Sequence, residues 1–266
     1  MKLHRPGTWI HYETQGQGPP VVLIHAISTG SRMWTRQVEA FTDHARVITF
    51  DARGVGRSGN LTGPRHIRDQ ISDDIAALLD ELGEESAFIC GVSFGGVIAQ
   101  HFAATHPHRV EALMVVDSYG DSRPLSLSRA AWLASVYAGS VSNFLPRTLL
   151  TGLMQQAYRQ WPEAAAHLAD AVRSLRPWQA FYTRNAINLV NYLPAITLAN
   201  YPVWFVLGED SWWRSERFAT EFAAAVPRAK LIRVPDSADP TPLCQPETFN
   251  DILRNALIET GHVKND

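Results

Sequence analysis

The sequence predicts an α/β fold, with a mostly parallel sheet flanked by helices and interrupted by an inserted helical segment. Short apolar runs alternate with helical patterns through the first half of the chain and again near its end. Such alternation is typical of parallel sheets with helices on both faces. Between these two parts, residues 122–198 have a helical pattern and are rich in aromatic side chains.

The individual elements follow from periodicity. Polar and apolar residues alternate over 8–13, which indicates a half-buried strand, and continuous apolar runs indicate buried strands at 21–25, 46–51, 86–92, 111–117, 202–208 and 229–234. Helical patterns cover 32–43, 65–83, 94–107, 215–226 and 246–259, and Gly83 ends the second of them. We therefore expect a core domain in two parts, 1–121 and 199–266, with 122–198 as a helical lid.

Composition excludes several classes of protein. The 266 residues are 45% hydrophobic and 19% charged, as in an ordinary globular protein, and the net charge of -2 gives no electrostatic reason to expect nucleic acid or an anionic membrane as a partner. Two cysteines are too few for a disulfide framework, and no apolar run resembles a signal peptide or a membrane span. We expect a cytoplasmic protein. No cluster has metal-ligand spacing or matches a nucleotide-binding fingerprint, so neither metal nor cofactor is predicted.

One short motif carries the chemistry. Gly91–Val92–Ser93–Phe94–Gly95 is a G-x-S-x-G sequence directly between a predicted strand and a predicted helix. In that context the serine occupies a sharp, strained turn, and its hydroxyl projects from the carboxyl edge of the sheet. The adjacent helix N-terminus favours negative charge.

This motif and three further stretches, VVLIHAISTGSRMW, DARGVGRS and LCQPETFNDIL, resemble the α/β-hydrolase family in the same order along the chain. The resemblance covers most of the chain apart from the lid. It implies that Ser93 is the nucleophile and that the backbone N–H groups of Phe94 and Ile27 form the oxyanion hole, where each donor can lower a barrier by about 3 kcal/mol. Ala26 replaces the family's glycine after His25, and the resemblance gives His25 a structural role.

Two positions depart from the family pattern. The column of the base histidine holds Asp239, and the only later histidine is His262, close to the C-terminus. The usual acid column holds Ser211, with Asp210 one residue earlier as a candidate acid. Asp117, after the strand that precedes the lid, is a second candidate, although a strand-end aspartate commonly caps the next turn.

An aspartate is a weaker base than a histidine. The reference pKa values of about 3.9 and about 6.5 differ by roughly 3.5 kcal/mol of proton affinity. Burial in an apolar site would recover part of this difference by raising the pKa of Asp239. Because both the base and the acid positions are changed, we interpret the site as altered in a coordinated way.

Three functions remain open from the sequence. The first is hydrolysis of an ester, thioester or lactone through Ser93, with Asp239 as an unusual base. The second is a non-hydrolytic lyase, decarboxylase or cyclase in which Asp239 shuttles a proton and the oxyanion hole holds an enolate. The third is ligand binding without catalysis.

The expected substrate is a small, apolar or aromatic carbonyl compound, because the lid is rich in aromatic residues. Candidate substrate contacts are Trp212, in the loop after the strand at 202–208, and Asn185 and Asn188, in the segment RNAINLVNY that also contains Arg184. Asparagines three residues apart lie near one face of a helix.

Overall fold

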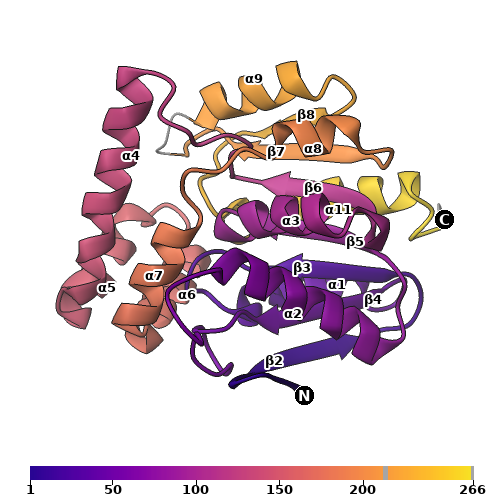
Figure 1. Ribbon diagram of the computed structural model, residues 1–266, viewed down its shortest axis with the longest axis horizontal. Coiled ribbons are helices and arrows are strands. Elements are labelled where there is room, and N and C mark those ends of the chain that lie inside the picture. Colours follow the sequence, from indigo (N-terminus) through magenta and orange to yellow (C-terminus); the bar gives the residue numbers. More distant parts are fainter. Residues whose placement is uncertain (212–214, 265–266) are drawn as a thin grey trace.

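An eight-stranded sheet runs through the centre of the molecule, in the order β1-β2-β4-β3-β5-β6-β7-β8 (Figure 1). The computed structural model describes residues 1–211 and 215–264, so Trp212 lies outside the described residues. β2 is antiparallel to both β1 and β4, and the other neighbouring strands are parallel. The strands are β1 Lys2–Arg5, β2 Thr8–Gln15, β3 Pro20–Ile24, β4 Arg46–Asp51, β5 Ala87–Val92, β6 Val110–Val116, β7 Val203–Gly208 and β8 Lys230–Val234.

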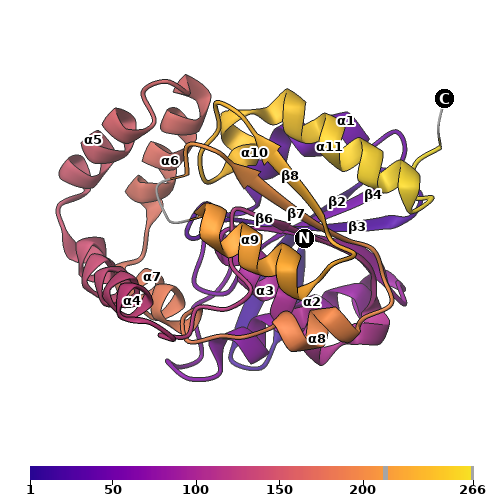
Figure 2. The same ribbon diagram turned by 90° about the horizontal axis from the view of Figure 1, so that it is seen from above.

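Helices cover both faces of this sheet, because its central strands are apolar on both sides. In β5, Ile89 belongs to one hydrophobic cluster, and Phe88 and Cys90 belong to the cluster on the opposite face. Figure 2 shows the two layers. One face is covered by α2 Ile67–Leu82, α3 Phe94–Thr105 and α9 Ser215–Ala225, and the other by η1 Ser31–Trp34, α1 Thr35–Phe41 and α11 Pro246–Glu259.

The strands and helices expected in the core are confirmed, most within two residues at either end. Three short elements were not expected: β1, η2 Pro107–Arg109 and α10 Thr241–Cys244. β1 has the sequence KLHR, in which only Leu3 is buried, so an edge strand of this kind carries no apolar pattern.

The helical segment between β6 and β7 contains α4 Leu127–Ser140, η3 Val141–Phe144, α5 Arg147–Ala157, α6 Pro162–Ser174, α7 Pro177–Ala186 and α8 Leu193–Leu198. The parallel strands point toward α4–α7, which stand beyond the carboxyl edge of the sheet (Figure 1). α8 instead packs beside α3 and α9, and Thr197 Oγ1 donates a hydrogen bond to the carbonyl of Ala225 at 2.8 Å. The part of the insertion that stands apart from the sheet therefore ends before α8. None of the described helices is both long and apolar enough to cross a membrane.

Candidate active site

Ser93 lies at a strained turn between β5 and α3, as the G-x-S-x-G motif predicts. Its φ is 55° and its ψ is -113°, a backbone conformation that residues with a side chain rarely adopt. Close packing holds the turn in place. A Cβ added to Gly91 would lie 2.1 Å from the carbonyl oxygen of Gly95, and one added to Gly95 would lie 2.2 Å from that of Ile24. The glycines therefore allow the strand and the helix to approach closely enough to project Ser93 from the sheet edge.

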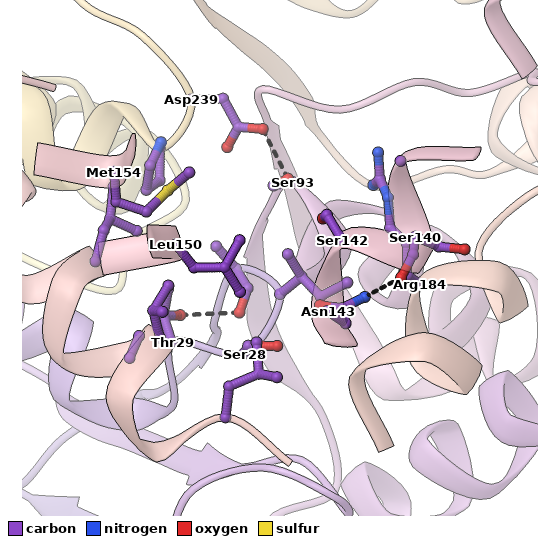
Figure 3. Close-up of a pocket in the computed structure, with 18 of the residues that line it drawn as sticks. Ser28, Thr29, Ser93, Ser140, Ser142, Asn143, Leu150, Met154, Arg184 and Asp239 are labelled. Carbon is purple, nitrogen blue, oxygen red and sulfur yellow. Dashed lines mark hydrogen bonds between the residues drawn. The ribbon is translucent and has the colours of Figure 1, made fainter. Parts of the chain in front are cut away.

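Asp239 is the hydrogen-bond partner of Ser93. The Ser93 hydroxyl donates to Asp239 Oδ2 at 2.8 Å, across 146 residues of sequence (Figure 3). Asp239 lies in the loop between β8 and α10, and the insertion holds this loop from outside. The Tyr158 hydroxyl donates to the main-chain carbonyl of Asp239, and Trp161 Nε1 donates to that of Asp236 at 2.8 Å. The insertion thus positions the loop that carries the candidate base.

Two backbone amides are available beside Ser93. Phe94 begins α3, Ile27 follows β3, and neither main-chain N–H donates a hydrogen bond to another group in the described part of the chain. Ile27 and Ala26 both border the cavity in front of Ser93. Free N–H groups beside a nucleophile, at a helix N-terminus, are suited to stabilise an oxyanion.

His25 and His262, the two histidines considered for the site, both pack into the fold away from Ser93. His25 is completely buried, its Nδ1 lies 2.6 Å from the carbonyl of Ala26, and its Nε2 accepts from the N–H of Ala52 at 2.9 Å. Burial lowers the pKa of His25, which favours the neutral ring. His262 Nε2 lies 2.9 Å from Glu111, and its ring packs against Phe88. Phe88 is near the start of β5, whereas Ser93 follows the end of this strand. Neither ring reaches Ser93.

Asp117 is the second carboxyl group of the site. It follows β6 with a φ of 46°, and its Oδ1 accepts from the N–H of Gly208 at 2.8 Å. Thr241 donates twice, from its N–H to Oδ2 at 2.6 Å and from its hydroxyl to Oδ1 at 3.1 Å. Asp117 therefore ties the end of β7 to the start of α10, next to the loop of Asp239. These partners lie 91 and 124 residues away in the sequence, so the contacts differ from the local turn cap that a strand-end aspartate commonly makes.

The two carboxyl groups act on each other electrostatically. Burial and the negative charge of Asp117 raise the pKa of Asp239 to about 8, against smaller lowering effects from the Ser93 hydrogen bond and the positive charge of Arg184. Burial also raises the pKa of Asp117, but three donated hydrogen bonds favour its ionised form. Asp239 is the carboxyl group that keeps a proton at neutral pH, and it becomes a base when the pH rises.

This shift predicts a pH-dependent effect on stability. A carboxyl group whose pKa is higher in the folded than in the unfolded state stabilises the fold below the unfolded value, and this contribution is lost as the pH rises through the folded value. Asp239→Asn cannot ionise. In urea titrations between pH 5 and pH 9, the free energy of unfolding of the variant should rise relative to that of the wild type by roughly 4 kcal/mol. A constant difference across this range, or an equal trend in Asp210→Asn, would contradict the assignment.

The other predicted site residues lie elsewhere. Asp210 is exposed, donates its N–H to the carbonyl of Ser237, and borders a surface hollow with Arg159 and Trp161. The structure does not bring its carboxylate to Ser93, because the residue that turns inward at this point of the loop is Ser211, which lines a cavity with Asp117 and Asp239.

Asn185 and Asn188 do not border either cavity beside Ser93. The side-chain amide of Asn185 donates to the carbonyl of Phe181 at 2.8 Å, and that of Asn188 donates to the carbonyl of Arg184 at 3.3 Å. Arg184 of α7 and Ile187, directly after this helix, border the smaller cavity. Because Asn185 is adjacent to Arg184 in the helix, its side chain points in another direction. Asn188 lies after the end of the helix, and its side chain bonds back to α7 instead of facing the cavity.

Two cavities meet at Ser93, Asp239 and Arg184, which border both. The larger has a volume of about 260 Å³ and lies between the insertion and the sheet edge. Figure 3 shows Leu150 and Met154 on one side of it and Ser140, Ser142 and Asn143 on the other. The smaller, of about 40 Å³, is bordered by Tyr119, Trp132 and Phe218.

Few aromatic residues of the insertion line the larger cavity. It is mainly aliphatic, and Tyr158 is the one aromatic residue of the insertion among its described lining residues. Phe144, Trp178, Phe181 and Tyr182 pack against one another instead. Sequence reasoning missed Tyr158 and Arg184 as cavity residues, because aromatic content does not show which rings turn inward. Within the described residues, no group of three or more His, Cys, Asp or Glu side chains is arranged to hold a metal ion.

Comparison with known proteins agrees with this geometry. A family model described as alpha/beta hydrolase fold matches residues 19–240. The chain belongs to the α/β-hydrolase fold family. That membership accounts for the elbow at Ser93 and for the order of its strands.

The proteins that this chain resembles include some that are named as lactonases or as lactone-degrading enzymes. 3-oxoadipate enol-lactonase 2 of Acinetobacter baylyi is 36% identical over 111 residues, which span 41% of this chain and 41% of that protein. An enol-lactonase structure from Burkholderia xenovorans LB400 superimposes with a TM-score of 0.83 at 22% identity, covering 97% of this chain and 99% of that one. Est816, titled an N-acyl homoserine lactone degrading enzyme, has a TM-score of 0.79 at 25% identity, covering 96% and 99%.

Proposed function

We propose that this protein is a hydrolase that cleaves a small ester, thioester or lactone, with Ser93 as nucleophile and Asp239 as its general base. The observation that carries the proposal is the 2.8 Å hydrogen bond from Ser93 Oγ to Asp239 Oδ2, at a cavity with two unengaged backbone amides. A general base must lie within hydrogen-bond reach of the proton it takes, and its best pKa is near the working pH. The direct contact and the raised pKa of Asp239 meet both requirements.

In the first half of the reaction, ionised Asp239 takes the proton of Ser93 while Oγ attacks the substrate carbonyl. The negative charge that forms on the carbonyl oxygen is stabilised by the N–H groups of Ile27 and Phe94. As the bond to the leaving group breaks, protonated Asp239 gives its proton to the departing alkoxide or thiolate. In a lactone this leaving group stays attached to the acyl-enzyme.

In the second half, a water molecule attacks the acyl-enzyme. Asp239 takes a proton from this water, the same amides stabilise the second oxyanion, and Ser93 receives the proton as the acid product leaves. No relay through a second residue is required, since Asp239 contacts Ser93 directly. Asp117 keeps the Asp239 loop in place and raises the pKa of Asp239, so it acts as a positioning residue.

We further propose that α4–α7 act as a lid over this site. Their contacts with the Asp239 loop, through Tyr158 and Trp161, support a lid that also shapes the site. In this division, residues 122–192 form the lid, and residues 1–121 and 193–266, which include α8, form the core domain.

A second candidate function is supported by the raised pKa of Asp239, which keeps this carboxyl group protonated at neutral pH. In this function the protein is a non-hydrolytic enzyme, and Asp239 donates a proton to the substrate and later recovers it. A carboxyl group with a raised pKa beside an oxyanion site is suited to reversible protonation of an enolate. In that case Ser93 would bind the substrate without attacking it. The two candidates differ in whether water enters the product.

The test combines a serine probe with isotope labelling. Incubation with a fluorophosphonate should add one phosphonyl group to the wild type, because Ser93 Oγ displaces fluoride, and nothing to Ser93→Ala, as measured by intact mass. Turnover of an ester in water enriched in oxygen-18 should place one heavy oxygen in the acid product. An unlabelled protein that converts a substrate without heavy-oxygen uptake would favour the non-hydrolytic enzyme. An unlabelled protein that binds ligands without converting them would identify a binding protein.

A further inference from the structure

Arg184 has a free guanidinium group at the centre of the site. It lies on α7, is partly buried, and borders both cavities together with Ser93 and Asp239. Among the described residues, its guanidinium has no hydrogen-bond or ion-pair partner. Nearby arginines of the insertion are engaged: Arg123 with Asp121 at 2.7 Å, and Arg147 with the carbonyl of Leu175 at 3.0 Å.

Partial burial of an unpaired cation costs desolvation free energy, which suggests that Arg184 binds a ligand. Taking a guanidinium out of water without a partner is unfavourable, and the fold offers Arg184 no acidic neighbour within ion-pair distance in its described part. Asp239 feels the positive charge of Arg184, which lowers its pKa, but the two form no ion pair. The five donors of Arg184 are therefore available in the cavity.

The guanidinium of Arg184 and the residues around it indicate which chemical class of ligand would bind. A planar guanidinium binds a carboxylate through two parallel hydrogen bonds. Arg184 is the one cationic side chain among the described residues that border the two cavities. Since Arg184 borders the same two cavities as Ser93, a bound carboxylate would lie close to the reacting carbonyl. The larger cavity then offers an aliphatic wall, including Leu150, Met154 and Leu175, for a short hydrocarbon chain.

We propose that Arg184 binds a carboxylate of the substrate, so that the preferred substrates are esters or lactones whose acyl part carries a second, ionised carboxyl group on a short aliphatic chain. This inference rests on the proposed hydrolase function and specifies its substrate class. It assigns to Arg184 the role of substrate recognition, separate from the proton transfer at Asp239.

The test uses two substrates that differ in charge but hardly in shape: monomethyl glutarate and the matching amide, methyl 4-carbamoylbutanoate. We expect the wild type to prefer the carboxylate substrate. Arg184→Gln should lower kcat/KM for the carboxylate on the order of 10- to 100-fold more than for the amide, because any effect of Arg184 on the pKa of Asp239 is common to both substrates. Arg184→Lys should restore part of the preference. Arg173→Gln is the matched control, because Arg173 is an exposed arginine of α6 that pairs with Asp170. This variant should keep the wild-type preference.

The outcomes separate this inference from the proposed function. Equal wild-type activity on both substrates, or an equal loss on both in Arg184→Gln, would overturn the carboxylate site while leaving the hydrolase proposal in place. If neither substrate is cleaved and the fluorophosphonate does not label Ser93, the hydrolase proposal itself fails. A direct measurement is binding of glutarate to Ser93→Ala by calorimetry. Binding that is lost in Ser93→Ala/Arg184→Gln supports the site, and binding that is unchanged contradicts it.

Discussion

Asp239→Asn is expected to lower kcat/KM for ester hydrolysis by about 10³-fold while leaving the fold intact. General-base catalysis contributes roughly 10²- to 10⁴-fold, and asparagine cannot accept the proton of Ser93. The substitution keeps the size of the side chain and an oxygen that can accept the 2.8 Å hydrogen bond from Ser93. The loss should therefore fall mainly on kcat, measured with an activated phenyl ester at pH 9.

The matched control is Asp210→Asn, which removes an exposed carboxylate from a neighbouring loop. Its kcat/KM should stay within about twofold of the wild type, as expected for a surface change. If Asp239→Asn retained activity within about threefold, another group would have to serve as base. If both variants lost activity equally, the effect would come from the net charge near the site.

The second large effect is on pH dependence. Because Asp239 must be ionised to accept a proton, kcat/KM should fall about tenfold per unit as the pH drops below the pKa of Asp239, which burial and Asp117 raise to about 8. Between the plateau near pH 10 and pH 6 the expected loss is therefore roughly 100-fold. Steady-state kinetics from pH 6 to pH 10 would measure this curve.

A variant at Asp117 tests the cause of the shift. Asp117→Asn removes the neighbouring negative charge, so the pKa of Asp239 should fall and the rise of kcat/KM should move to lower pH. Circular dichroism would verify that the variant still folds, since Asp117 also bonds Gly208 and Thr241. A wild-type midpoint near 6.5 that does not move in Asp117→Asn would indicate a histidine base instead.

In the proposed mechanism, one carboxyl group performs the proton transfers beside the serine. Burial and, after it, the negative charge of Asp117 raise the pKa of Asp239, while the carboxylate oxygens of Asp117 accept hydrogen bonds from Gly208 and Thr241. The usual acid column is free of a carboxylate, and Ser211 occupies it. The coordinated change expected from the sequence is consistent with this arrangement, although its second carboxylate is Asp117 and not Asp210.

Local patterns were sufficient for much of this protein. Runs such as 46–51 and 246–259 coincide with β4 and α11, because buried strands and amphipathic helices each leave a distinct periodicity in the sequence. The G-x-S-x-G motif predicts that Ser93 lies between a strand and a helix. The resemblance of the segment after residues 229–234 to the α/β-hydrolase family indicates that Asp239 occupies the base position. These features depend on neighbours within a few residues of each other.

Other features depend on contacts between distant segments. Whether Asp239 points at Ser93, and whether Asp117 or Asp210 accompanies it, is decided by loops from three separate strands that meet at the sheet edge. Likewise, the packing of the insertion places Arg184 at the cavity, whereas the side chains of Asn185 and Asn188 bond to main-chain carbonyls of their own segment.

The sequence by itself therefore determined the class of fold, the strand and helix positions and the identity of the candidate nucleophile and base. The tertiary structure decided which carboxyl groups interact, how far burial raises their pKa values, and which insertion residues face the cavity. The physical reason is that hydrophobic periodicity is a local property of the chain, whereas desolvation and charge–charge interactions depend on everything that packs around a group.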